Sequence, residues 1–242
     1  MLLSLLQGGD LKSMIASLLL SLPVILLALS FHETAHGYVA YKCGDRTAYN
    51  LGRLTLNPLK HFDPIGFLCM MVFGYGWAKP VPINTRNFNN PKRGMALSAA
   101  AGPLSNLLLG IVSAFLYGIA NAYYTYLFYT AGKDSFLCTA VMWLTLFFML
   151  GAYYNFFFAF FNLIPVPPFD GSRIALAFLP TNTYFRIMRY ERQIMFGTLI
   201  TLMLLSRLGL SPFSMASEGL TDLIATPTGN LFWEKIFLPK LF

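Results

Sequence analysis

Four apolar stretches alternate with polar, basic segments along the chain. The first, Met14 to Tyr41, contains no lysine or arginine, and Glu33 is its only carboxylate. As a helix it would be about 40 Å long, which is enough to cross a bilayer with tilt. Three more stretches, at 94–117, 139–164 and 194–208, predict further spans. The pattern therefore predicts an all-α polytopic membrane protein with about four transmembrane helices.

The segments between these spans predict less regular structure. Residues 53–58 alternate between polar and apolar side chains, which is typical of a short β-strand. Residues 65–78 are apolar but too few to cross, and basic segments flank them on both sides. We therefore expect a re-entrant or β-strand segment near residues 50–85. We interpret 118–137 as a short polar-aromatic connection, and 210–242 as an interfacial C-terminal segment.

The composition agrees with a membrane protein. Of the 242 residues, 56% are hydrophobic and 11% are charged, whereas about a quarter of the residues in a soluble domain are charged. The net charge of +7 comes from basic residues in short loops between apolar stretches. This distribution follows the positive-inside rule and argues against nucleic-acid binding. We expect one multi-pass domain, 1–242 with its core at 13–209, in the cell (cytoplasmic) membrane.

His32, Glu33 and His36 form the pattern His-Glu-x-x-His near the end of the first apolar stretch. Positions i and i+4 share one face of a helix, so both imidazoles can bind a single zinc ion. Glu33 lies beside them, where a general base must be to take a proton from water. Ionisable groups at membrane depth are costly and usually functional. The alternative is a polar cluster that only joins helices by hydrogen bonds.

Asp170 is the candidate for the third metal ligand. Glu33 is the only other acidic residue at membrane depth in the apolar stretches, and the prolines before Asp170 keep the chain non-helical. Two histidines and one aspartate, with a fourth position for water, would form an open catalytic zinc site on the cytoplasmic side. The alternative is that Asp170 caps a helix that continues through Ile174.

Three other polar residues have two interpretations each. Asn106 and Asn162 are amides within the spans, where they join helices by hydrogen bonds or hold a substrate backbone and its oxyanion. His61 lies in a basic loop, where a solvated side chain is favoured over a metal ligand.

Three motifs follow one another along the chain. They are His32-Glu33-x-x-His36, Ala101-Gly102-Pro103-x-x-Asn106 and the proline-rich stretch from Asn162 to Gly171. Together they resemble the site-2 protease family of intramembrane zinc metalloproteases, and residues 53–58 and 77–84 resemble its compact bacterial branch. Only 55 residues separate Asn106 from Asn162, so no PDZ domain fits between them.

The resemblance implies a role for each candidate residue. Asp170 would be the third zinc ligand and Glu33 the catalytic base, while Asn106 and Asn162 would serve the substrate. Residues 50–85 would guide an unwound peptide to the zinc.

The predicted function is zinc-dependent hydrolysis of a peptide bond in or near a transmembrane segment of a membrane-protein substrate. One Zn²⁺ per chain would be held by His32, His36 and Asp170. The expected partners are the lipid bilayer and the substrate's transmembrane helix, not nucleic acid, and nothing in the sequence specifies an oligomer. One alternative is a metal-ion transporter or channel that uses the same three residues as a transit site. Another is a non-catalytic substrate-binding protein, which the presence of Glu33 disfavours.

Overall fold

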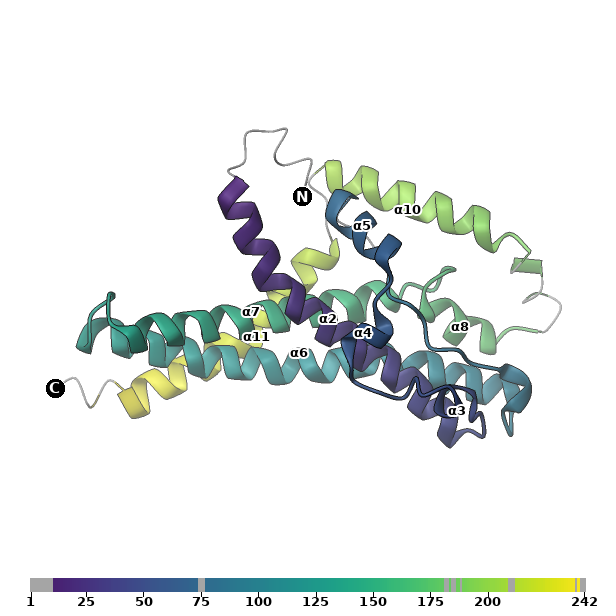
Figure 1. Ribbon diagram of the computed structural model, residues 1–242, viewed down its shortest axis with the longest axis horizontal. Helices are drawn as coiled ribbons and strands as arrows, with labels where there is room; N and C mark the ends of the chain where they lie inside the picture. Colours follow the sequence, from purple (N-terminus) through teal and green to yellow (C-terminus); the bar gives the residue numbers. More distant parts are fainter. Residues whose placement is uncertain are drawn as a thin grey trace. The chain divides into compact units, whose positions relative to one another are not determined.

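The computed structural model describes residues 11–73, 77–180, 183, 186–187, 189–208, 212–237 and 239. Within them all regular secondary structure is helical, so the all-α prediction is confirmed. The helices follow in this order (Figure 1): α2 (Leu11–Lys42), α3 (Thr47–Asn50), α4 (Pro58–His61), α5 (Pro64–Phe73), η1 (Thr85–Asn87), α6 (Pro91–Thr130), α7 (Phe136–Asn162), α8 (Asp170–Ala177), α10 (Glu191–Arg207), α11 (Pro212–Phe232) and η2 (Trp233–Phe237).

Among the described helices, three are long and apolar enough to cross a membrane. They are the Leu18–Lys42 part of α2, the whole of α6 and the whole of α7. The fourth predicted span corresponds to α10, whose 17 residues would extend about 26 Å, less than the ~30 Å of a bilayer's hydrocarbon core. α5 has 10 residues, fewer than a crossing needs. The fourth crossing and the re-entrant path therefore stay predictions.

Several helices begin where a polar residue precedes a proline. The polar side chain accepts hydrogen bonds from free N–H groups of the first turn, and proline fits there because it has no N–H to satisfy. The pairs are Asn57-Pro58, Asp63-Pro64 and Asn90-Pro91, whose side chains accept from Leu59 N at 3.0 Å, Gly66 N at 2.8 Å and Arg93 N at 3.1 Å. The sequence thus fixes the starts of α4, α5 and α6 locally.

The β-strand predicted at residues 53–58 is wrong, since 53–57 form an irregular connection and α4 begins at Pro58. Side chains, and not a neighbouring strand, satisfy the carbonyl oxygen of Thr55. Thr55 O accepts hydrogen bonds from Thr34 Oγ1 at 2.7 Å and from His61 Nε2 at 2.8 Å. The described residues 50–73 and 77–85 contain no β-strand.

The connection predicted at 118–137 is wrong over most of its length, because α6 continues to Thr130. No proline interrupts it between 104 and 130, so the aromatic and polar residues there extend the helix. The chain turns at Gly132, where φ is +81°, a left-handed conformation that glycine adopts without strain. Ser135 Oγ then accepts from Cys138 N at 3.1 Å and caps α7.

The chain divides into two compact units, Met1–Asn106 with Phe158–Ser211 (unit 1) and Leu107–Phe157 with Pro212–Phe242 (unit 2). In unit 2, α6 lies along α7, and α11 crosses them obliquely (Figure 1). Glycines of α6 allow close contact with both neighbours. A Cβ atom on Gly110 would lie 2.5 Å from a ring carbon of Phe156, and one on Gly118 would lie 2.5 Å from Ala225 O. Phe237, the last residue of η2, stacks on Tyr123 and Tyr126 of α6. Unit 1 contains every predicted site residue.

Candidate metal centre and active site

Helix α2 brings two imidazoles to one point of unit 1. His32 and His36 are one helical turn apart, and both are buried. Their ring centroids lie 4.5 Å apart with the ring planes at 86°, and their Nε2 atoms are 3.0 Å apart. This is the arrangement that the His-x-x-x-His spacing predicts for a helix.

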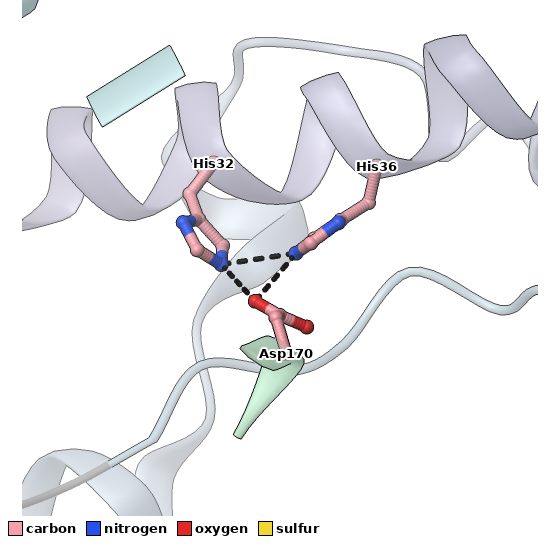
Figure 2. A group of neighbouring side chains, drawn as sticks. All are labelled: His32, His36 and Asp170. Carbon is pink, nitrogen blue, oxygen red and sulfur yellow. Dashed lines mark hydrogen bonds and ion pairs between the residues drawn. The ribbon is translucent and has the colours of Figure 1, made fainter. Parts of the chain in front are cut away.

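Asp170 completes this group, which we call the trio (Figure 2). It is the first residue of α8, and its Oδ2 atom lies 3.1 Å from Nε2 of each histidine. Within the described part of the chain, His32, His36 and Asp170 form a group that could hold a metal ion, with ligand atoms within 4.8 Å of one another. The contact of the carboxylate with both rings favours the ligand interpretation over the helix-cap alternative.

An oxygen acceptor holds the second nitrogen of each imidazole. His32 Nδ1 lies 2.6 Å from Asn106 Oδ1, and His36 Nδ1 lies 2.7 Å from Ser98 O. Each Nδ1 therefore carries a proton and donates it to its acceptor. When both rings are neutral, as metal binding requires, their Nε2 lone pairs point at each other and at the Asp170 carboxylate. Three converging lone pairs are unfavourable unless a cation lies among them.

Zinc fits this donor set. Two imidazole nitrogens and one carboxylate oxygen are ligands typical of catalytic zinc sites, which keep a fourth position open. With zinc–ligand bonds of about 2.0–2.1 Å, the ligand atoms around a tetrahedral ion lie about 3.3 Å apart. The corresponding separations in the trio are 3.0–3.1 Å. The two Nδ1 hydrogen bonds supply the outer support that orients histidine ligands.

Gly102 and Ser98 of α6 also shape this site, and our sequence analysis assigned no site role to either. A Cβ atom on Gly102 would lie 2.4 Å from His36 Nε2 and 2.7 Å from His32 Cε1. Ser98 Oγ donates to His36 O at 2.9 Å, while Ser98 O accepts from the ring of the same histidine. The small residues at 99–103 were the available signal, because such a run allows a neighbouring element to approach closely.

Glu33 follows His32 on α2 and is half-buried. Its Oε2 atom accepts a hydrogen bond from Val81 N at 2.8 Å. Val81 belongs to the irregular segment 77–84, so a backbone group far along the chain fixes one oxygen of this carboxylate.

The two predicted amides lie in different settings. Asn106 is fully buried, and its Nδ2 donates to Ala28 O at 3.2 Å while its Oδ1 holds His32. Asn162 ends α7, and its Nδ2 donates to Phe158 O at 3.0 Å, one turn earlier. Among the hydrogen bonds described for the chain, none joins Asn162 to the trio. The substrate role of both amides stays a prediction.

The prediction that His61 is a solvated loop residue is wrong. Its side chain is 3% exposed, and its Nε2 donates to Thr55 O at 2.8 Å. Its carbonyl oxygen accepts from Lys79 N at 2.9 Å. His61 therefore joins the two irregular segments of unit 1, because the short helix α4 turns it inward.

Comparison with known proteins agrees with this site. Residues 20–205 match the model of Peptidase family M50. A Bacillus subtilis protein, named "Putative zinc metalloprotease YwhC", is 41% identical over 172 residues, which cover 69% of this chain and 74% of the relative. No solved structure matches the chain significantly.

Two further relatives bear names of the same form. MJ0611 of Methanocaldococcus jannaschii is 29% identical over 157 residues, 64% of this chain and 69% of its own length. Rip2 of Mycolicibacterium smegmatis is 29% identical over 104 residues, 41% of this chain and 39% of its own length. Neither the family nor these names support the alternative of a metal transporter. The chain belongs to peptidase family M50, the site-2 protease family, and is a multi-pass zinc metalloprotease.

Proposed function

We propose that this zinc metalloprotease is an intramembrane endopeptidase that cuts a peptide bond in or near a transmembrane segment of a membrane protein. The position of the trio carries the proposal. His32 and His36 lie within Leu18–Lys42, which is long and apolar enough to cross a membrane. His36 precedes the basic end of this helix at Lys42 by about 9 Å of helix rise. A peptide bond that reaches the trio would therefore lie below the lipid headgroups.

In this proposal His32, His36 and Asp170 hold the zinc ion, and Glu33 is the general base. Zinc in this position would supply a Lewis acid that polarises the scissile carbonyl and acidifies the attacking water. The hydrogen bond from Val81 N occupies Glu33 Oε2. Oε1 is then the oxygen that accepts the proton of the attacking water and passes it to the leaving nitrogen.

The substrate must unwind before it is cut. A transmembrane helix satisfies its backbone groups internally, so its carbonyls are not free for attack. The irregular segment 77–84 contacts Glu33 through Val81, which supports a guiding role for residues 50–85. A peptide that pairs with backbone groups of this region would recover part of the hydrogen bonds lost on unwinding.

The basic residues orient the protein in this proposal. Twelve of the 17 lysine and arginine residues lie within 42–93 and 173–192. By the positive-inside rule these segments face the cytoplasm. We therefore assign the protein to the cytoplasmic membrane, with its active site toward the cytoplasmic side.

The test is cleavage of a defined membrane-protein substrate by the purified protein in detergent. We expect cleavage that a chelator stops and added Zn²⁺ restores. The Glu33→Gln variant should keep its zinc and lose activity by a factor on the order of 10²–10⁴, because the proton acceptor is gone. Cleavage by this variant at the wild-type rate would refute the assigned base. Zinc flux into liposomes without any cleavage would favour a transporter.

A further inference from the structure

Asp45 is a fully buried carboxylate just beyond the end of α2 and outside the trio. Thr47 donates to its Oδ1 atom twice within the same turn, from the backbone N at 3.0 Å and from Oγ1. Two more donors come from a distant segment, Asn84 N at 2.7 Å from Oδ2 and Asn87 Nδ2 at 3.0 Å from Oδ1. A buried carboxylate needs such donors to offset its desolvation. Two of these four bonds lie within the turn, and the other two join Asn84 and Asn87 to the end of α2.

The segment Lys79–Asn84 is also held at its other end. Arg53 Nη2 donates to Lys79 O at 3.0 Å and to Pro80 O at 3.2 Å. Lys79 N donates to the carbonyl oxygen of His61 at 2.9 Å. Asp45 and Arg53 therefore fix the two ends of a stretch of six residues.

The middle of this stretch contacts the proposed base. Val81 N donates to Glu33 Oε2 at 2.8 Å. The Val81 side chain is 6% exposed and packs on α2 at Gly37, where a Cβ atom would lie 2.9 Å from Val81 Cγ1. Pro80 and Pro82 flank Val81 and restrict the backbone. A shift of either end would therefore move the Val81 N–H group relative to the Glu33 carboxylate.

We propose that Asp45 is a positioning residue for the reaction: by holding Asn84 and Asn87 it fixes Lys79–Asn84 across α2, so that Val81 N–H sets the orientation of Glu33. This inference rests on the proposed role of Glu33 as the base. Misplacement of a catalytic group by about 1 Å costs on the order of 10²-fold in rate. Loss of the hydrogen bonds from Asn84 and Asn87 to residue 45 should therefore lower kcat without removing zinc.

The test replaces Asp45 with asparagine. A second variant also replaces Asn87 with aspartate, so that the amide and the carboxylate of this pair change places. In Asp45→Asn one acceptor oxygen becomes an NH₂ group that faces a donor, either Asn84 N or Asn87 Nδ2. In the double variant Asp45→Asn/Asn87→Asp, the new amide can accept from Asn84 N and donate to the new carboxylate. Both long-range bonds are then kept, and the two bonds that Thr47 donates to Oδ1 are lost. The matched control is Asp63→Asn, because Asp63 accepts from Ile65 N and Gly66 N within its own turn.

Four quantities are measured for each variant in detergent: bound zinc, kcat, KM and hydrogen exchange over residues 79–87. We expect Asp45→Asn to keep its zinc and its KM, to exchange faster over 79–87, and to lose about 10- to 100-fold in kcat. The double variant should regain most of the lost kcat, and Asp63→Asn should match the wild type.

Two results would overturn the positioning role. One is wild-type kcat in Asp45→Asn despite faster exchange over 79–87. The other is a loss of kcat that follows a loss of zinc and is not restored in the double variant. Failure of the proposed function has a different signature, since the wild-type protein itself would then show no zinc-dependent hydrolysis.

Discussion

Substitution of Gly102 by alanine tests the packing of the zinc site most sharply. The added Cβ would lie 2.4 Å from His36 Nε2, 2.5 Å from His36 Cε1 and 2.7 Å from His32 Cε1. Ordinary contacts between such atoms begin near 3.4 Å, so the overlaps are about 0.7–1.0 Å. A ring that moves away from Gly102 would stretch the hydrogen bond of its Nδ1 atom, because Asn106 Oδ1 holds His32 and Ser98 O holds His36.

This overlap is expected to lower both the stability of the fold and the affinity for zinc. Overpacking of this kind costs about 1–3 kcal/mol, and a ring that moves away also loses its outer hydrogen bond. Disruption of such outer support lowers metal affinity by about 10- to 100-fold. We therefore expect Gly102→Ala to bind zinc at least about tenfold more weakly and to lose activity at limiting zinc.

The assay is competition for zinc with a chelator of known affinity, followed by activity at saturating zinc. Gly197→Ala is the matched control, because a Cβ on Gly197 of α10 would meet no atom within 4 Å. This control should bind zinc like the wild type. Wild-type zinc affinity in Gly102→Ala would refute the geometry that places both imidazoles against α6.

Three further predictions follow from single contacts. Asp170→Ala should purify with little zinc, because the trio loses its only carboxylate, and metal analysis measures this. Asn106→Ala should weaken zinc binding by about 10- to 100-fold through loss of the His32 acceptor, whereas Asn162→Ala should leave zinc affinity unchanged in the same competition assay. Burial would raise the pKa of Asp45, but its hydrogen bonds outweigh this and lower its pKa. The stability that Asp45 contributes is therefore present above its unfolded-state pKa of about 3.9 and is lost as pH falls through the lower folded-state pKa. The difference in Tm between the wild type and Asp45→Asn should close over that range.

Each of these expectations has a contradicting result. Full zinc content in Asp170→Ala would remove this residue from the ligand set. Equal zinc affinities of the Asn106 and Asn162 variants would show that Asn106 does not orient His32. A Tm difference that persists unchanged at low pH would show that the Asp45 carboxylate is not the group that the hydrogen bonds stabilise.

Local patterns predicted the parts of the site that depend on one helix. The spacing of His32 and His36 places both rings on one face of any α-helix, so the sequence suffices for that pair. The role of Asp170 as a candidate ligand was predicted by a different argument, because a carboxylate in an apolar stretch needs a partner. In each case a strong local constraint left few alternatives.

The contacts of α6 with α2 lay beyond such reasoning. Gly102 and Ser98 contact His36 only because two helices distant in sequence meet at one point. A run of small residues allows close packing but does not specify which helix packs against it. The strand predicted at 53–58 failed for a similar reason. The alternation of polar and apolar side chains favoured a β-strand paired with a neighbour. In the structure, Thr34 and His61 instead donate hydrogen bonds to the carbonyl oxygen of Thr55.

The most direct test of intramembrane proteolysis is to map the bond that is cut. The wild-type protein and a substrate with a single transmembrane segment would be reconstituted together in liposomes with zinc, and the products identified by mass spectrometry. We predict cleavage within the apolar segment, in the half of the bilayer nearer the basic loops, and none with Glu33→Gln. Cleavage confined to the soluble flanks of the substrate, or no cleavage by protein that retains zinc, would contradict the proposal.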